Sequence, residues 1–182
     1  CFDGQEYSSL DIKQSIQLGI QVIYQDMSIF PNLTVAENIA MNYELYNKRK
    51  LVNWKNVETI AKQALAHIGI DIPLHESVGS LSIADKQLIA IARSILYNSR
   101  LIIMDEPTSA LTRREVDKLF KVIRQLQKEG ISILFVSHKL DEVFEIADQF
   151  TVFRNGRLIV SKEAKNITNE QFVFYMTGRN IE

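Results

Sequence analysis

Residues 100–138 read RLIIMDEPTSALTRREVDKLFKVIRQLQKEGISILFVSH, and this stretch decides the fold. It opens and closes with short apolar runs, at 101–104 and 131–136. Runs of this kind are typical of parallel strands that are buried on both faces of a sheet. The helical segment between them begins with a capping box, Thr112 to Glu115, and carries an apolar stripe. The stretch therefore predicts a strand, a crossover helix and a second parallel strand.

Further strands are predicted on both sides of this unit. Residues 19–26, GIQVIYQD, form an apolar run that ends in polar residues. Residues 150–160, FTVFRNGRLIV, alternate around an Asn-Gly pair, which is a strong hairpin signal. Residues 2–7, FDGQEY, also suggest a strand. We therefore expect a mostly parallel α/β core with a hairpin near its C-terminal end.

The middle of the chain is predicted to be helical. Thr34 to Glu37 and Ser82 to Asp85 have the spacing of helix starts, and an apolar stripe from Trp54 to Ile68 marks a helix between them. A helical subdomain thus interrupts the α/β core. The expected division is a partial core at 1–30, a helical subdomain at 31–98 and the remaining core at 99–182.

Composition narrows the class of protein. With 182 residues, 46% of them hydrophobic, the chain suits one globular domain, or one domain plus a small subdomain. Its formal net charge of −1 means that it lacks the bulk positive charge that attracts nucleic acid. Its single cysteine excludes an internal disulfide and fits a reducing compartment. Its apolar runs fall far short of the roughly 20 residues that cross a bilayer.

An acidic pair lies where open α/β sheets bind ligands. Asp105 and Glu106 directly follow an apolar strand, so both carboxylates are expected at the carboxyl edge of the sheet. An aspartate there can hold magnesium, and an adjacent glutamate can accept a proton from an attacking water. The alternative is an ordinary solvated acidic turn before Pro107.

Two more polar residues are expected at the same edge. Gln25 and His138 each follow an apolar strand, and the carboxyl ends of parallel strands align. The Gln25 amide could ligate magnesium, or Gln25 could be a turn residue only. His138 could alternatively cap the helix that follows it. Ser82 begins a helix whose N-terminus favours an anion, although an ordinary N-cap role explains it equally well.

Taken in order, Gln25, LSIADKQ at 81–87, LIIMDEPTSALT at 101–112 and VSH at 136–138 resemble the ATP-binding cassette (ABC) ATPases. The resemblance covers nearly the whole chain. Within that family, the sequence looks like the first cassette of the tandem ATPase subunits of bacterial monosaccharide importers of the ribose, galactose or xylose type. It implies a P-loop NTPase-like fold with an inserted helical subdomain.

The resemblance also implies roles for individual residues. Asp105 and Glu106 correspond to the Walker B pair, in which Glu106 is catalytic and Asp105, together with Gln25, holds the metal. His138 corresponds to the catalytic switch histidine. The implied nucleotide-binding residues are Gln25 of the Q-loop, Ser82, Ile83, Ala84 and Asp85 of the signature motif, and Ser109 of the D-loop.

Cofactors, partners and location follow from the same resemblance. It implies ATP and Mg²⁺, an integral-membrane permease, and a second cassette that closes head to tail on nucleotide. A periplasmic or surface sugar-binding protein is an indirect partner, and nucleic acid is not one. The implied location is cytoplasmic, on the inner face of the cell membrane.

The sequence departs from the family pattern in two places. The usual signature is Leu-Ser-Gly-Gly-Gln, and here Ile83 and Ala84 replace both glycines. None of the seven glycines is followed by lysine, so the phosphate-loop pattern G-x-x-x-x-G-K-[ST] is absent. We therefore expect the chain to begin after that loop, to be inactive alone, and to leave apolar sheet surface without its cover.

Two other functions remain open at this stage. The first is a non-hydrolytic remnant of a cassette that serves as a protein-interaction module. The retained Gln25, Asp105, Glu106 and His138 argue against that role. The second is a cassette ATPase of DNA repair or translation, which predicts long coiled-coil or basic insertions that the sequence lacks.

Overall fold

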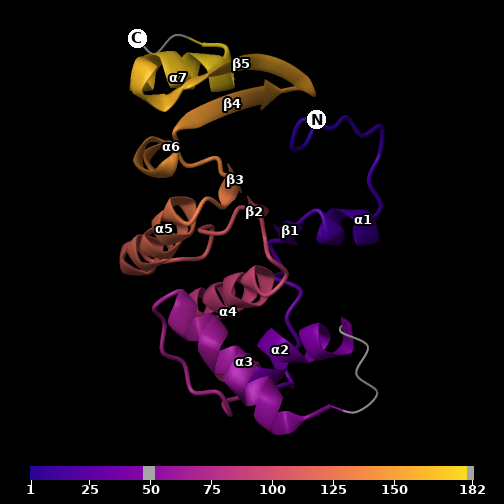
Figure 1. Cartoon of the computed structure of the whole chain (residues 1–182). Coiled ribbons are helices and arrows are strands. Elements are labelled where there is room, and N and C mark those ends of the chain that lie inside the picture. The colour runs from indigo at the N-terminus through magenta and orange to yellow at the C-terminus, as the bar shows by residue number, and fades with distance from the viewer. Residues whose placement is uncertain (47–51, 180–182) are drawn as a thin grey trace. The chain divides into compact units, whose positions relative to one another are not determined.

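The computed structural model describes residues 1–46 and 52–179. The chain divides into two compact units, residues 1–136 and residues 137–182. Residues 47–51, which belong to the predicted helical subdomain, and residues 180–182 lie outside the described residues. Figure 1 follows the chain through its elements by colour. None of the described helices is long and apolar enough to cross a membrane.

A parallel three-stranded sheet lies at the centre of the first unit. Its strands are β1 (Ile20–Ile23), β2 (Leu101–Asp105) and β3 (Ser132–Val136), in the order β1-β2-β3. The register aligns Ile23 with Met104 and Asp105 with Val136, so the carboxyl ends of the strands meet at one edge. The predicted strands and their parallel direction are confirmed.

Only one face of this sheet is well covered. Ile23, Ile102 and Met104 are buried, and Phe120 of α5 (Arg113–Lys128) packs edge to face on Phe135 with ring centroids 5.9 Å apart. Complete burial of the apolar strands is not observed, and the predicted exposure of apolar sheet surface is confirmed. On the opposite face Val22 is 40%, Leu134 47% and Val136 43% exposed. These three side chains are only partly covered by the described residues, so their apolar character does not lead to full burial.

The N-terminal residues also differ from the expectation. The predicted strand at residues 2–7 is wrong, because the segment makes a tight turn in which Phe2 and Gln5 form an isolated bridge. Asp3 and Gly4 within the turn have φ values of 54° and 76°. A short helix, α1 (Ile12–Gln17), follows and leads into β1.

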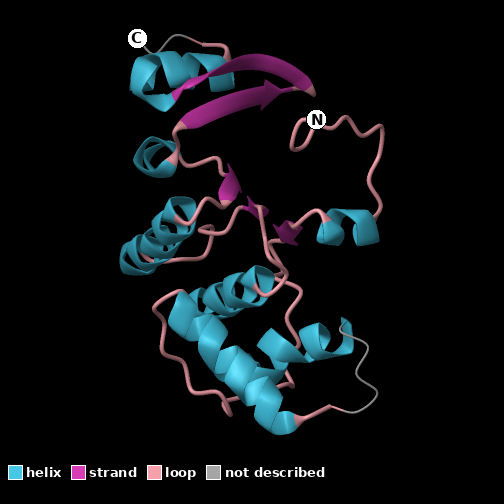
Figure 2. Cartoon of the chain, viewed as in Figure 1, coloured by secondary structure: helices cyan, strands magenta, loops and turns pink. Residues whose placement is uncertain are grey.

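Between β1 and β2 the chain forms a group of helices, as predicted. They are α2 (Val35–Tyr46), α3 (Trp54–His67) and α4 (Ile83–Ile95), drawn as cyan ribbons in Figure 2. The 3₁₀ turn η1 (Val78–Ser80) lies between α3 and α4. At the start of α2 the Glu37 carboxylate accepts hydrogen bonds from the Thr34 backbone and hydroxyl, both at 2.7 Å. The three helices bury a shared apolar core that includes Ile39, Val57, Ala61, Leu65, Leu88 and Ile91.

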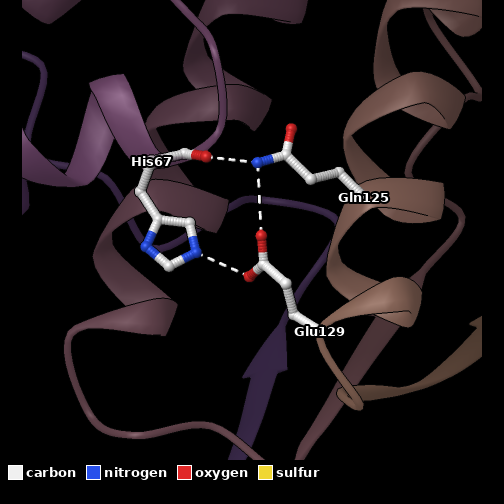
Figure 3. A network of polar contacts seen from close by, with 3 residues as sticks. All are labelled: His67, Gln125 and Glu129. Carbon is white, nitrogen blue, oxygen red and sulfur yellow. Dashed lines mark hydrogen bonds and ion pairs between the residues drawn. The ribbon is translucent and has the colours of Figure 1, made fainter.

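A polar network joins this helical group to α5 (Figure 3). His67, the last residue of α3, lies 2.6 Å from the Glu129 carboxylate just beyond α5. The Gln125 amide donates both to the His67 carbonyl and to Glu129. The hydrogen bond from His67 is the largest cause that holds the pKa of Glu129 below its ordinary value. The network ties two helix ends that are about 60 residues apart in sequence.

The second unit is built on the predicted hairpin. Strands β4 (Gln149–Arg154) and β5 (Arg157–Glu163) pair antiparallel, and Asn155 and Gly156 between them have φ values of 52° and 72°. Two left-handed residues are what a tight hairpin turn requires. Its remaining elements are α6 (Leu140–Ile146), η2 (Ala164–Asn166) and α7 (Asn169–Thr177), packed around Phe150, Val152 and Phe172.

Candidate functional site

Two of the predicted site residues line the same cavity at the carboxyl edge of the parallel sheet. Gln25 lies two residues beyond β1, and Asp105 is the last residue of β2. Both line an open cavity of about 630 Å³ whose other walls come from Tyr24, Asp26 and Ser28. The alignment of parallel strands thus brings together an amide and a carboxylate that are 80 positions apart in sequence.

The cavity offers oxygen donors of the kind that magnesium prefers. Besides the Gln25 amide and the Asp105 carboxylate, it is lined by Asp26 and by the Ser28 hydroxyl. Asp26 also accepts a hydrogen bond from the Ser28 backbone at 3.2 Å, which folds the turn back on itself. Two carboxylates, an amide and a hydroxyl form a hard oxygen set, and such a set fits Mg²⁺.

Glu106 holds an unusual backbone conformation beside this cavity. Its φ is 45°, in the left-handed region that residues with a Cβ rarely adopt. Its N–H donates to the Val136 carbonyl at 2.9 Å, and its carbonyl accepts from Ser109 N–H at 3.2 Å. Strained backbone of this kind persists where neighbouring contacts fix it, and it is common at functional sites. Ser109 itself is exposed in the turn that follows.

His138 belongs to the other unit of the chain. It lies two residues after β3 and is exposed, and Ser137 beside it donates to the buried Glu142 at 3.2 Å. The predicted meeting of His138 with Asp105 and Glu106 stays a prediction.

The segment at the start of α4 caps itself. Ser82 accepts a hydrogen bond from Asp85 N–H at 3.1 Å, and its hydroxyl donates to the Asp85 carboxylate at 2.8 Å. Lys118 of α5 lies 3.6 Å from the same carboxylate. Ile83 is exposed and Ala84 is buried. The Ser82 hydroxyl, which could have donated a hydrogen bond to a bound anion, therefore donates to the Asp85 carboxylate instead.

Sequence reasoning missed three residues around the cavity. Asp26 and Ser28 line it, and their position directly after a strand and beside Gln25 could have indicated this. Arg93 of α4 was not predicted either. Its guanidinium donates to the carbonyls of Met27 and Ser28, and no local sequence pattern signals a contact across 65 positions.

Comparison with known proteins gives consistent matches. A family model described as "ABC transporter" matches residues 1–109. The ribose import ATP-binding protein RbsA of Bacillus licheniformis is 40% identical over 98% of this chain and 36% of its own length. A putative ribose/galactose/methyl galactoside import ATP-binding protein of Halalkalibacterium halodurans is 41% identical over 99% of this chain and 35% of its own length. The chain thus spans about a third of these curated relatives.

Solved structures support the fold. An ATP-binding cassette of an ABC transporter in its ADP conformation superposes with a TM-score of 0.71 at 24% identity, covering 88% of this chain and 68% of that one. A dimeric cassette in a post-hydrolysis state, bound to ADP and Pi, gives 0.73 at 19% identity, covering 91% and 72%. The P-loop NTPase-like arrangement is therefore confirmed.

Proposed function

Since this chain belongs to the ABC transporter family, we propose that it is part of an ATPase that powers sugar import through a separate membrane permease. The observation that carries the proposal is the cavity that Gln25 and Asp105 share at the carboxyl edge of a parallel sheet. The identity with ribose and galactose import proteins supports a monosaccharide as the transported substrate.

In this proposal the cavity is the metal end of the nucleotide site. Asp105 and Gln25 would hold Mg²⁺, and Asp26, which lines the same cavity, offers a second carboxylate. When bound, the cation neutralises charge on the phosphates of ATP. The protein contributes fixed oxygen atoms that need not reorganise, because the strand ends and the turn after β1 hold them.

Glu106 has the role of general base. Its carboxylate would accept a proton from the water that attacks the terminal phosphate, and the backbone bonds at its N–H and carbonyl hold the residue in place. Ser109 would line the D-loop beside it. His138 would steady the terminal phosphate. This part of the proposal rests on the family resemblance.

The start of α4 would face nucleotide held by a second cassette, in a head-to-tail pair. Ser82, Ile83, Ala84 and Asp85 form that surface in the proposal. Ser82 must then exchange its Asp85 partner for a phosphate oxygen. A carboxylate at this position repels an approaching anion, so we expect weaker contact with nucleotide here than at a Gly-Gly-Gln signature.

The remaining features of the proposal concern organisation. The core comprises 1–30 and 99–182, and the helical subdomain comprises 31–98. The region from about residue 30 to 72 would dock the permease on the inner, cytoplasmic face of the membrane. A sugar-binding protein would act through the permease. The alternative, a non-hydrolytic interaction module, predicts the same fold without turnover.

ATP hydrolysis by the product of the complete gene tests the proposal. Glu106→Gln should keep ATP binding and lower the Mg²⁺-dependent rate by roughly 10²–10⁴-fold, the usual contribution of a general base. Glu163→Gln, the same change on β5, should leave the rate unchanged. The 182 residues alone should not hydrolyse ATP, because they contain no Gly-Lys pair to hold the β- and γ-phosphates. Equal rates in wild type and Glu106→Gln would favour the non-hydrolytic alternative.

A further inference from the structure

One side chain of α4 holds the turn that follows Gln25. Arg93 lies in the last turn of that helix, and its two terminal nitrogens donate to the Ser28 carbonyl at 2.9 Å and the Met27 carbonyl at 3.0 Å. A planar guanidinium that donates to two successive carbonyls is a directional, charge-assisted contact. Burial lowers the pKa of Arg93, which reflects its partly enclosed position.

The two carbonyls belong to residues whose backbone conformation is unfavourable for a residue with a side chain. Met27 has a φ of 58° and Ser28 a φ of 45°, and both carry a Cβ. Such residues remain left-handed only when surrounding interactions hold them there. Local bonds contribute, because Met27 N–H donates to the Tyr24 carbonyl at 2.8 Å and Ser28 N–H to Asp26 at 3.2 Å. Arg93 adds two bonds from outside the turn.

The far end of the same segment is held separately. Asn38 of α2 is buried, and its side chain accepts from Phe30 N–H and donates to the Phe30 carbonyl, both at 2.9 Å. The segment from Gln25 to Phe30 is therefore held by β1 at one end and by Asn38 at the other. Arg93 holds its strained centre at Met27 and Ser28, and Ser28 lines the cavity together with Gln25.

We propose that Arg93 is a positioning residue, whose two hydrogen bonds hold Met27 and Ser28 left-handed against α4 and thereby fix Gln25 in the cavity it shares with Asp105. α4 begins at the Ser82 cap, so one helix links the signature segment to the turn that carries Gln25. The inference rests on the proposed function only for the role given to Gln25.

Nuclear magnetic resonance of the 182-residue chain tests this without nucleotide. In Arg93→Met, which keeps the apolar stem but removes the donors, amide exchange at Met27 and Ser28 should rise at least about tenfold, the effect of losing a hydrogen bond to a charged group. The Gln25 side-chain NH₂ should become mobile on the picosecond to nanosecond timescale. Arg93→Lys, which keeps charge without the fork, should give intermediate values.

A matched control is available in the same unit. Arg100 also makes a two-pronged contact, to the Asp3 carboxylate at 2.8 and 2.9 Å, and Arg100→Met should leave Met27, Ser28 and Gln25 unchanged. Unchanged exchange at Met27 and Ser28 in Arg93→Met would overturn the proposal. So would an equal rise throughout α4 and β2, because that result indicates a folding role alone. If Arg93→Met does not fold, the same comparison is made on Arg93→Lys.

The test separates this inference from the proposed function. It reads the turn and the Gln25 side chain directly and involves no ATP. A failed hydrolysis assay would leave the positioning role intact, and a failed exchange experiment would leave the ATPase proposal intact.

Discussion

Residues with left-handed backbone follow both of the proposed metal ligands, Gln25 and Asp105. Met27 and Ser28 follow Gln25, and Glu106 follows Asp105, all with φ between 45° and 58°. Each costs on the order of 1–3 kcal/mol of strain. The hydrogen bonds that Arg93 donates to Met27 and Ser28, and the one that the Val136 carbonyl accepts from Glu106, help to offset it. The turns that carry the proposed ligand and base are thus held by contacts from other elements.

A pH-dependent contact is expected at Glu129. Its folded-state pKa lies below the ordinary 4.5, so it stabilises the folded state above that value and loses this contribution as pH falls through the folded-state pKa. Glu129→Gln should lower the free energy of unfolding at pH 6 by about 1 kcal/mol or less, because the pair is exposed to solvent. Urea unfolding at several pH values measures the difference.

Below the folded-state pKa of Glu129, the wild type and Glu129→Gln should be equally stable. A difference that stays the same at pH 3 and pH 6 would contradict the assigned role of the His67 contact.

At the scale of elements, one glycine joins the starts of β1 and β2. Gly19 has a φ of 77°, and its carbonyl accepts from Arg100 N–H at 2.8 Å and Leu101 N–H at 3.1 Å. A Cβ there would lie 2.7 Å from the Asn98 carbonyl oxygen. At Gly69, with a φ of 67°, an added Cβ meets nothing within 4 Å.

These two glycines form a matched pair of substitutions. Gly69→Ala should cost about 1–2 kcal/mol for the left-handed backbone alone. Gly19→Ala should lower the free energy of unfolding by roughly 1–3 kcal/mol more than Gly69→Ala does, because the added Cβ would also contact the Asn98 carbonyl oxygen. Urea unfolding followed by the fluorescence of the single tryptophan, Trp54, reports on this unit. Equal losses in both variants would show that the close approach to Asn98 relaxes freely.

Some of these elements and contacts were predictable from the sequence, and others were not. The starts of α2 and α4 were predictable because Thr34 with Glu37, and Ser82 with Asp85, bond within one helical turn. The meeting of Gln25 with Asp105 was predictable because parallel strands align their ends. Arg93 was not, because its contact joins distant segments through side-chain length and helix placement. Exposure of apolar sheet surface was predictable from the absent phosphate-loop pattern, but the face that would be exposed was not, because that depends on what packs against each face.

At the scale of the whole molecule, the uncovered sheet face has a consequence. Val22, Leu134 and Val136 expose apolar surface on one side of the sheet. Burying apolar area contributes roughly 25 cal/mol per Å², so a few hundred Å² favours association by several kcal/mol before entropic costs. We expect the 182-residue chain to self-associate, and Leu134→Gln to weaken that association.

Light scattering across a dilution series measures this association. Leu158→Gln is the control, since Leu158 on β5 is equally apolar and even more exposed but lies in the other unit. A wild-type chain that stays monomeric at every concentration would mean that the exposed face is tolerated in water. An equal effect of both variants would place the association elsewhere.

We propose that the carboxyl edge of this sheet holds a divalent cation for nucleotide chemistry. The most direct measurement adds Mn²⁺ to the ¹⁵N-labelled chain and follows the paramagnetic relaxation of backbone amides. We expect relaxation to rise at residues 24–28 and 104–106, Mg²⁺ to reverse it, and Asp105→Asn to abolish it while Asp148→Asn does not. Relaxation that is the same in Asp105→Asn as in the wild type, or that is spread evenly along the chain, would contradict it.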